Sequence, residues 1–259
     1  LTPDLEADIS TLGADAARLF SGINRALFAA ADDPLRPVMN GVFFDFNTDG
    51  LAVVASDGRK LSCTRLLDVT TDTPASFILH KKPANIVRNI LQKEVGDVTI
   101  RFNGRNAVIA SECYDLSCRL IEGKFPNYNS VIPTSSVHNI IVDKDQLFFA
   151  SKRVSLFSNR ASSLVILDFA DDSIRITGQD LDLSIAAEET ISCSGQQAGT
   201  RLRIGFDFSY LQRLLQNVAS EQIQFSLNDQ TRAGVITPLT SDEGIDITAL
   251  IIPMKLLGE

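Results

Sequence analysis

Residues that could perform acid–base or metal chemistry are few in this sequence. The chain has 2 histidines, His80 and His138, which are far apart in the sequence. Two isolated imidazoles leave little room for a histidine metal site or a histidine base, so we expect surface or helix-capping roles. The 4 cysteines make no close Cys-x-x-Cys pair and predict small, buried or half-buried side chains in a reducing compartment. They are Cys63, Cys113, Cys118 and Cys193. We therefore expect no metal and no cofactor.

Carboxylates offer another route to catalysis. Asp32-Asp33 and Asp171-Asp172 stand in expected turns, where aspartate is favoured for local hydrogen bonding. The sequence has no phosphate-binding loop, no Gly-x-Gly-x-x-Gly, no Gly-x-Ser-x-Gly and no His-Glu-x-x-His motif. These observations favour a protein that is not an enzyme. A hydrolase that uses scattered carboxylates as acid and base stays open as an alternative.

The positive charges are more suggestive of a function. The net charge of −8 argues against a generic nucleic-acid binder, although the field at a surface is local. If the expected helices line one surface, their basic residues could present a basic strip to phosphates. On charge alone, ordinary solvated helix faces are the favoured alternative. The basic residues on these helices are Arg18, Arg25, Lys81, Lys82, Arg88, Lys152, Arg153 and Arg213.

The length of 259 residues suits one large domain or two of ordinary size. The sequence has no apolar run long enough to span a bilayer and no signal-peptide pattern at its start. We therefore expect a cytoplasmic protein without a membrane partner.

Apolar periodicity predicts four helices among many antiparallel strands. Helices are predicted over residues 15–31, 84–93, 145–157 and 208–218. Turn sequences such as Asn47-Thr48-Asp49-Gly50 separate the strands into hairpins. Strands are predicted over 9–11, 39–46 and 51–55, then directly after a turn at 56–61, and over 75–79, 98–102, 107–111 and 114–120. In the second half they are predicted over 140–142, 165–169, 174–178, 185–190, 202–206, 223–227, 233–237 and 247–252.

The second half of the chain repeats the element order of the first. Residue types also recur 123 positions later: Val42 and Val165, Asp45 and Asp168, Phe46 and Phe169, Asp49 and Asp172, Asp57 and Asp180, Ile100 and Ile223, and Phe102 and Phe225. Leu91-Gln92 matches Leu215-Gln216 one position further along. We interpret the two halves as an internal duplication of one α+β domain.

The middle stretch, residues 122–133, joins the two halves. It has a turn-forming glycine, two prolines and no helix or strand periodicity. Its large apolar residues, Phe125, Tyr128, Val131 and Ile132, indicate a loop that packs against something. We interpret it as a connector held between two domains; an ordinary ordered loop in one domain is the alternative. The predicted organisation is a linker remnant at 1–8, domains at 9–121 and 134–259, and the connector at 122–133.

Five motifs carry a resemblance to a known family. Glu122-Gly123-Lys124-Phe125-Pro126-Asn127-Tyr128, followed by Val131-Ile132-Pro133, resembles the connector of the bacterial DNA sliding clamp, the beta subunit of DNA polymerase III. Ile252-Pro253-Met254-Lys255-Leu256 resembles the family's closing Met-Pro-Met-Arg-Leu. Ala55-Ser56-Asp57-Gly58-Arg59-Lys60-Leu61 resembles its Ala-Thr-Asp-Gly-His-Arg-Leu turn. Met39-Asn40-Gly41 and Ile204-Gly205-Phe206-Asp207 resemble its Leu-Asn-Gly and Ile-Gly-Phe-Asn.

The resemblance implies a fold and an assembly. It implies a tandem repeat of DNA-clamp domains, each with two helices packed on antiparallel sheets, and matches the second and third of the family's three domains. In the family, two subunits close head to tail into a homodimeric ring around double-stranded DNA, so the basic helix residues would face the DNA. The first domain would be missing here. Leu156 and Phe157 match the region that meets that domain of the partner subunit.

The resemblance also implies a peptide-binding groove between the two domains. It would receive short motifs with a glutamine and a Leu/Phe end, and adaptable methionines suit such a slot. Without the resemblance, its apolar members would be assigned to ordinary core. Lys60 and Lys255 replace arginines, and Leu257-Gly258-Glu259 extends past the family's usual end, which would affect peptide affinity. The groove residues would be Met39, Ser56, Gly58, Lys60, Leu61, Pro126, Val131, Tyr210, Ile252, Pro253, Met254 and Leu256.

The function implied is that of a DNA polymerase processivity factor. This is a non-catalytic sliding clamp of DNA replication that docks the DNA polymerase III catalytic subunit, the clamp loader and repair proteins. Two alternatives stay open: a clamp-fold interaction scaffold that does not encircle DNA, and a carboxylate-dependent hydrolase.

Overall fold

The computed structural model describes residue 5, residues 9–196 and residues 199–256, so the expected linker at 1–8 and the end at 257–259 fall almost wholly outside it. The chain divides into two compact units. Unit 1 comprises Leu1–Tyr128 and Asp242–Ile247, and unit 2 comprises Asn129–Ser241 and Thr248–Glu259. None of the described helices is long and apolar enough to cross a membrane.

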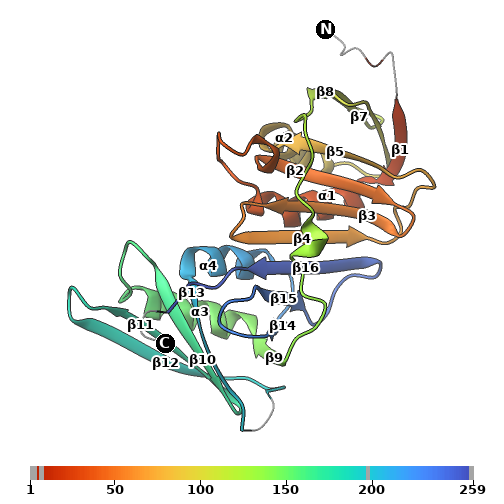
Figure 1. Ribbon diagram of the computed structural model, residues 1–259. Coiled ribbons are helices and arrows are strands. Elements are labelled where there is room, and N and C mark those ends of the chain that lie inside the picture. The colour runs from red at the N-terminus through yellow and green to blue at the C-terminus, as the bar shows by residue number, and fades with distance from the viewer. Residues whose placement is uncertain (1–4, 6–8, 197–198, 257–259) are drawn as a thin grey trace. The chain divides into compact units, whose positions relative to one another are not determined.

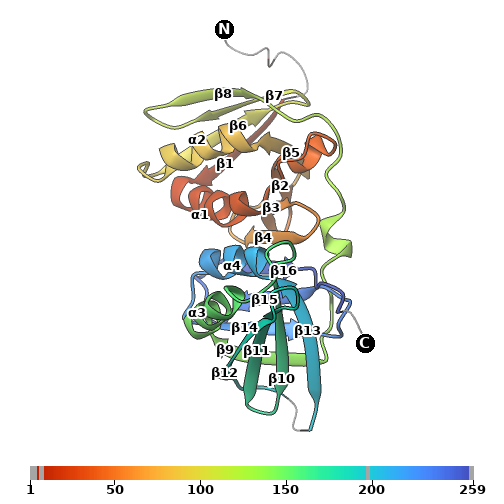
Figure 2. The ribbon, with the colours of Figure 1, turned by 90° about the vertical axis from the view of Figure 1, so that its left-hand side faces the viewer.

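Unit 1 contains two antiparallel sheets and a pair of α-helices (Figure 1). One sheet has the strand order β5-β2-β3-β4 and the other has the order β1-β6-β7-β8. Helices α1 (Ala16–Ala26) and α2 (Lys81–Leu91) lie side by side in Figure 2, and apolar residues of both helices and both sheets form one core. The strands are β1 (Ser10–Asp15), β2 (Gly41–Asn47), β3 (Gly50–Ser56), β4 (Lys60–Leu66), β5 (Ala75–His80), β6 (Asp97–Phe102), β7 (Asn106–Ala110) and β8 (Asp115–Arg119).

The first helix is capped by a side chain and shortened by its surroundings. Asp15 Oδ1 accepts hydrogen bonds from the backbone N–H groups of Ala17 and Arg18, which satisfies two free donors at the helix start. Helix α1 is shorter than the predicted 15–31 because Leu27–Ala29 forms a 3-10 helix. Ala30 is then extended, with ψ at 140°, so the chain leaves the helical path there.

The two histidines have different roles. His80 Nδ1 accepts a hydrogen bond of 3.2 Å from the Lys82 N–H, which confirms the capping role and starts α2 three residues earlier than predicted. Pro83 lies in the first turn of α2, where its missing N–H costs no helical hydrogen bond. His138 begins β9 and is buried, so the expectation of a surface or capping role is wrong for this residue.

The four cysteines are free thiols. Cys63 is buried and Cys118 and Cys193 are half-buried, as predicted, but Cys113 is exposed. Burial raises the pKa of Cys63 to about 12 and that of Cys118 to about 11. Both thiols therefore stay protonated at neutral pH, and a protonated thiol is a poor nucleophile.

Unit 2 repeats the architecture of unit 1. Its sheets have the orders β13-β10-β11-β12 and β9-β14-β15-β16, which are the unit 1 orders with eight added to each strand number. Helices α3 (Lys144–Ser155) and α4 (Phe208–Asn217) pack together (Figure 2). The predicted duplication of an α+β fold is confirmed. The strands are β9 (His138–Asp143), β10 (Leu164–Ala170), β11 (Ser173–Asp180), β12 (Ile185–Ser192), β13 (Arg201–Asp207), β14 (Gln222–Leu227), β15 (Gly234–Pro238) and β16 (Ile245–Ile251). The first three residues of β16 belong to unit 1 and the rest to unit 2.

The constant offset of 123 holds only for the first hairpin of each repeat. Strands β2 and β10 begin at 41 and 164, but β6 and β14 begin at 97 and 222. Ile100 is therefore equivalent in strand position to Phe225, and its predicted match with Ile223 is wrong. A slip of two residues keeps a side chain on the same face of its strand, so both registers show the same apolar alternation. The match of Leu91-Gln92 with Leu215-Gln216 does not hold in the structure either. Leu91 is the last residue of α2, whereas α4 continues to Asn217.

Candidate functional site

The turn between β3 and β4 holds three of the predicted docking residues in a tight network. Ser56 Oγ accepts from the Gly58 N–H and donates to the Lys60 carbonyl at 2.8 Å. Asp57 Oδ1 accepts from the N–H groups of Arg59 and Lys60, and Asp57 Oδ2 forms an ion pair with Lys60 Nζ. Burial raises the pKa of Asp57, but the bonds from Lys60 and the backbone outweigh it and hold the pKa below its usual value. Because the Lys60 side chain is 3% exposed, it stabilises the turn rather than reaching into solvent.

Arg36 joins this turn to Met39, which no sequence pattern suggested. Arg36 Nη1 lies 3.7 Å from Met39 Sδ, and a Cβ added to Gly58 would lie 2.8 Å from the same nitrogen. Gly58 therefore leaves room for the guanidinium, and its φ of +87° also favours glycine. Asp33 Oδ2 accepts from Arg36 Nε at 2.8 Å. The signal that could have revealed Arg36 is this Asp–Arg spacing of three residues.

The connector packs against unit 1 through two aromatic residues. The Phe125 ring stacks on Phe43 with centroids 4.8 Å apart, and the Tyr128 ring meets Phe43 edge-on at 6.2 Å. The Tyr128 hydroxyl donates to Asp45 Oδ2 at 2.8 Å. The prediction of a packed loop is confirmed for both aromatic residues. It is wrong for Val131, whose exposed fraction is 51%.

The C-terminal segment of unit 2 lies along strand β13. The Met254 N–H donates to the Gly205 carbonyl at 2.8 Å. A Cβ added to Gly205 would lie 2.7 Å from Leu256 Cδ2 and 2.8 Å from Leu164 Cδ1, so glycine permits the close approach. Leu256 is buried at 8% exposure, which makes it part of the packing of unit 2.

The other predicted docking residues differ in exposure. Those with exposed side chains offer contact area to a partner, whereas buried ones shape the surface beneath. Pro126, Val131 and Ile252 are exposed, Tyr210, Pro253 and Met254 are half-buried, and Met39, Ser56 and Leu61 are buried. The structure places Met39, Ser56, Gly58, Lys60, Leu61 and Pro126 in unit 1, and Val131, Tyr210, Ile252, Pro253, Met254 and Leu256 in unit 2.

Three of the eight predicted DNA-facing residues form ion pairs with nearby carboxylates. The pairs are Arg18 Nε with Asp68 at 2.8 Å, Arg25 Nη2 with Asp242 at 3.1 Å, and Arg153 with Glu189 through two hydrogen bonds. Glu189 raises the pKa of Arg153, and Arg153 lowers the pKa of Glu189. These three guanidinium groups are partly neutralised and contribute less to any basic surface.

The remaining five have no carboxylate partner in the described part of the chain. Arg88 donates to the neutral Asn89 Oδ1 at 3.1 Å. Lys152 Nζ lies 5.8 Å from the ring centroid of Phe148, within cation–π range. Lys82, Lys152 and Arg213 are exposed, and Lys81 and Arg88 are half-buried.

Exposed leucines adjoin the two residues predicted at the ring interface. Leu156 is 77% exposed and Phe157 is 40% exposed, just after α3. The Asn159 N–H donates to the Gln179 carbonyl, which brings this segment to the end of β11. Leu181 and Leu183 follow β11 and are 80% and 66% exposed. Four exposed apolar residues therefore lie on two segments that the Asn159–Gln179 hydrogen bond brings together.

Among the described residues, no group of three or more His, Cys, Asp or Glu side chains is placed to hold a metal ion. The acidic pairs also serve local structure. Asp33, for example, accepts from the Leu35 N–H and pairs with Arg36.

Two tandem α+β domains that share the same strand order define a clamp-type protein. The crystal structure of the DNA polymerase III beta subunit from Thermotoga maritima matches 99% of this chain and 68% of its own, with a TM-score of 0.89 and 26% sequence identity. The DNA polymerase sliding clamp from Pseudomonas aeruginosa matches 95% of this chain and 67% of its own, with a TM-score of 0.88 and 25% identity.

Two family models match consecutive parts of the sequence. The DNA polymerase III beta subunit central domain matches residues 15–127, and the C-terminal domain of that subunit matches residues 129–255. The chain belongs to the DNA polymerase III beta subunit family. The resemblance drawn from the sequence motifs is therefore confirmed.

Relatives in this family are similar in sequence but longer. The beta sliding clamp of Pseudomonas aeruginosa is 26% identical over 235 residues, and that of Treponema pallidum is 28% identical over 260 residues. These alignments cover 90% and 98% of this chain. They cover 62% and 67% of the relatives, so this chain spans about three-fifths of the Pseudomonas protein.

Proposed function

We propose that this chain forms part of a DNA polymerase processivity factor, a non-catalytic subunit that slides on double-stranded DNA in the cytoplasm. The observation that carries the proposal is the duplication: both repeats have one strand order, and they match the central and C-terminal domain models in sequence. The complete subunit would close with a second copy into a ring. Leu156 and Phe157 would lie at the contact between subunits.

The proposed mechanism is physical. A closed ring cannot leave DNA without opening, so it raises the effective concentration of an attached polymerase at its template. Contacts to phosphates that carry no sequence information would allow sliding. Lys81, Lys82, Arg88, Lys152 and Arg213 suit such contacts because no carboxylate of the described residues pairs with them, whereas Arg18, Arg25 and Arg153 would contribute weakly.

The second part of the proposal is a docking role. We propose that the docking residues of both units contact one short linear motif from the DNA polymerase III catalytic subunit, the clamp loader or repair proteins. Half-buried Met254 and Pro253 and exposed Ile252 offer an apolar, adaptable surface. In unit 1, the hydrogen-bonded turn at Ser56 and Asp57 and the Arg36 guanidinium would supply fixed polar groups.

Titration with a fluorescein-labelled Gln-Leu-Ser-Leu-Phe peptide tests the docking role. We expect saturable binding that Met254→Ala weakens about tenfold, because truncating a central apolar contact costs one to a few kcal/mol. Val95→Ala is the matched control, since Val95 is 96% exposed and lies outside the docking set. Absence of binding to the wild-type chain would contradict the docking role. Duplex DNA titrated at low salt distinguishes a clamp, which binds it, from a scaffold that binds peptide alone.

A further inference from the structure

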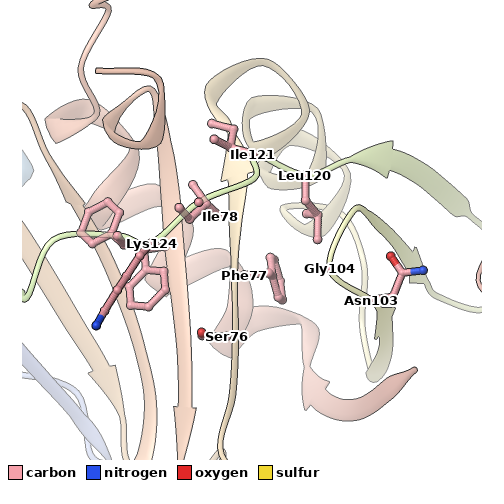
Figure 3. A pocket seen from close by; sticks show the side chains of 11 residues that line it. Ser76, Phe77, Ile78, Asn103, Gly104, Leu120, Ile121 and Lys124 are labelled. Atoms are coloured by element: carbon pink, nitrogen blue, oxygen red, sulfur yellow. The ribbon is translucent and has the colours of Figure 1, made fainter. Parts of the chain in front are cut away.

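A hollow opens in unit 1 at the free edge of strand β5. Its volume is about 340 Å³, which is at the lower end of the range for ligand pockets. Four segments enclose it: β5, the turn between β6 and β7, residues 120–125 of the connector, and strand β2 through Phe43. Figure 3 shows Phe77 and Leu120 beside Asn103 and Gly104, with Ser76 and Lys124 on the other side. None of its lining residues belongs to the predicted docking set.

The backbone of β5 is open at this hollow. The Ile121 N–H donates to the Ile78 carbonyl at 3.0 Å, so the polar groups of Ile78 point away from β2. In an antiparallel pair, hydrogen-bonding groups alternate along the strand, and Ser76 therefore also points its N–H and C=O away from β2. The connector pairs with β5 at Ile78 and then diverges. The outward backbone of Ser76 faces the hollow and can pair with an added extended segment.

The side chains around the hollow sort into an apolar floor and a polar rim. Phe77 and Leu120 belong to the apolar core of unit 1 and are 5% and 6% exposed. Ser76 and Lys124 lie at the rim and are exposed. Lys124 is the single charged lining residue, and it forms no ion pair with the described residues. The hollow thus combines an unpaired strand edge, an apolar floor and one positive charge.

We propose that this hollow binds the C-terminal end of a peptide whose last side chain is apolar. The terminal side chain occupies the space above Phe77 and Leu120, and the terminal carboxylate meets the Lys124 ammonium. The peptide backbone pairs with the outward N–H and C=O of Ser76, as in strand addition to a sheet edge. The small volume and the short stretch of open edge at Ser76 suit one or two terminal residues rather than a long segment.

Fluorescence anisotropy with a fluorescein-labelled Gly-Ser-Thr-Val-Phe peptide tests this proposal in the full chain. The peptide lacks glutamine and leucine, so it does not present the motif of the docking role. We expect weak saturable binding with the free carboxylate and about threefold weaker binding with a C-terminal amide or with Lys124→Gln, as for an exposed ion pair. Lys93→Gln, an exposed lysine outside the hollow, is the matched control and should leave binding unchanged.

A second variant tests the strand edge. Ser76→Pro removes the outward N–H while keeping the hydrogen bonds between β2 and β5, and should weaken binding about fivefold. Circular dichroism confirms that the variant is folded. Equal binding of the acid and amide peptides, or of wild type and Ser76→Pro, would overturn the proposal. Loss of binding with Met254→Ala, or displacement by the unlabelled Gln-Leu-Ser-Leu-Phe peptide, would also overturn it and assign the peptide to the docking residues instead.

Discussion

The Tyr128 hydroxyl donates a 2.8 Å hydrogen bond to Asp45 Oδ2 and so ties the connector to strand β2. Asp45 is the fifth residue of β2, and Asp168 is the fifth residue of β10, its counterpart in the repeat. Asp168 instead accepts two hydrogen bonds from Arg201, and Arg175 lies 3.8 Å away. The carboxylate at this repeated strand position therefore has two roles: Asp45 anchors the connector in unit 1, and Asp168 orders arginines in unit 2.

Replacing Tyr128 with phenylalanine tests the first of these contacts. Burial and the Asp45 carboxylate raise the pKa of Tyr128, so the hydroxyl remains a donor at neutral pH. Tyr128→Phe should lower the free energy of unfolding by about 1–2 kcal/mol, because it leaves Asp45 without this donor. Urea unfolding measures the change. Tyr114→Phe is the control, since Tyr114 is 52% exposed, and an equal loss in both variants would contradict the contact's role.

The Asp168 carboxylate should make the stability of the fold decrease at acidic pH. The hydrogen bond from Arg201, outweighing partial burial, lowers the pKa of Asp168 below its usual value. A carboxyl whose pKa is lower in the folded state stabilises the fold above its unfolded pKa, near about 3.9, and this contribution disappears as the pH falls through the folded pKa. Asp168→Asn should therefore flatten the loss of thermal stability below about pH 4.

Thermal midpoints measured between neutral pH and about pH 3 check this prediction. Asp172→Asn, in the exposed turn after β10, provides a matched control. If Asp168→Asn and wild type lose stability equally on acidification, Asp168 is not the group responsible.

The sequence was informative where structure is local. Alternating apolar residues predicted the strands, and helical spacing predicted all four helices, because one face of each element is buried in a core. Helix ends were missed where distant or flanking groups decide them, as with the His80 cap of α2. Tertiary approaches such as that of Leu256 to Gly205 join residues from distant parts of the chain, so no spacing in the sequence encodes them. The docking set came from motif resemblance rather than from periodicity.

The packing of the C-terminal segment depends on Gly205. A Cβ at this position would lie 2.7 Å from Leu256 and 2.8 Å from Leu164, so both side chains must move. Gly205→Ala should cost about 1–3 kcal/mol of stability, as overpacking usually does. Because the Met254 N–H donates to the Gly205 carbonyl, the variant should also weaken binding of the Gln-Leu-Ser-Leu-Phe peptide. Gly13→Ala is the control, since nothing lies within 4 Å of its added Cβ.

Urea unfolding and peptide anisotropy together evaluate the Gly205 variant. Unchanged stability and unchanged peptide binding would show that the segment tolerates displacement and that Gly205 is not required.

Under the proposed sliding-clamp function, the ion pairs on the helices predict which charges would contact DNA. Lys82 and Arg213 are exposed and have no carboxylate partner among the described residues, whereas Arg153 is paired with Glu189. Lys82→Gln and Arg213→Gln should each weaken duplex DNA binding and reduce the slope of log K against log salt by about 1, because each removes one phosphate contact. Arg153→Gln is the matched control and should change both quantities less, since its charge is already compensated. Anisotropy of a labelled duplex over a salt series provides the slopes. An Arg153→Gln effect as large as that of Lys82→Gln would mean that local pairing does not select the phosphate contacts.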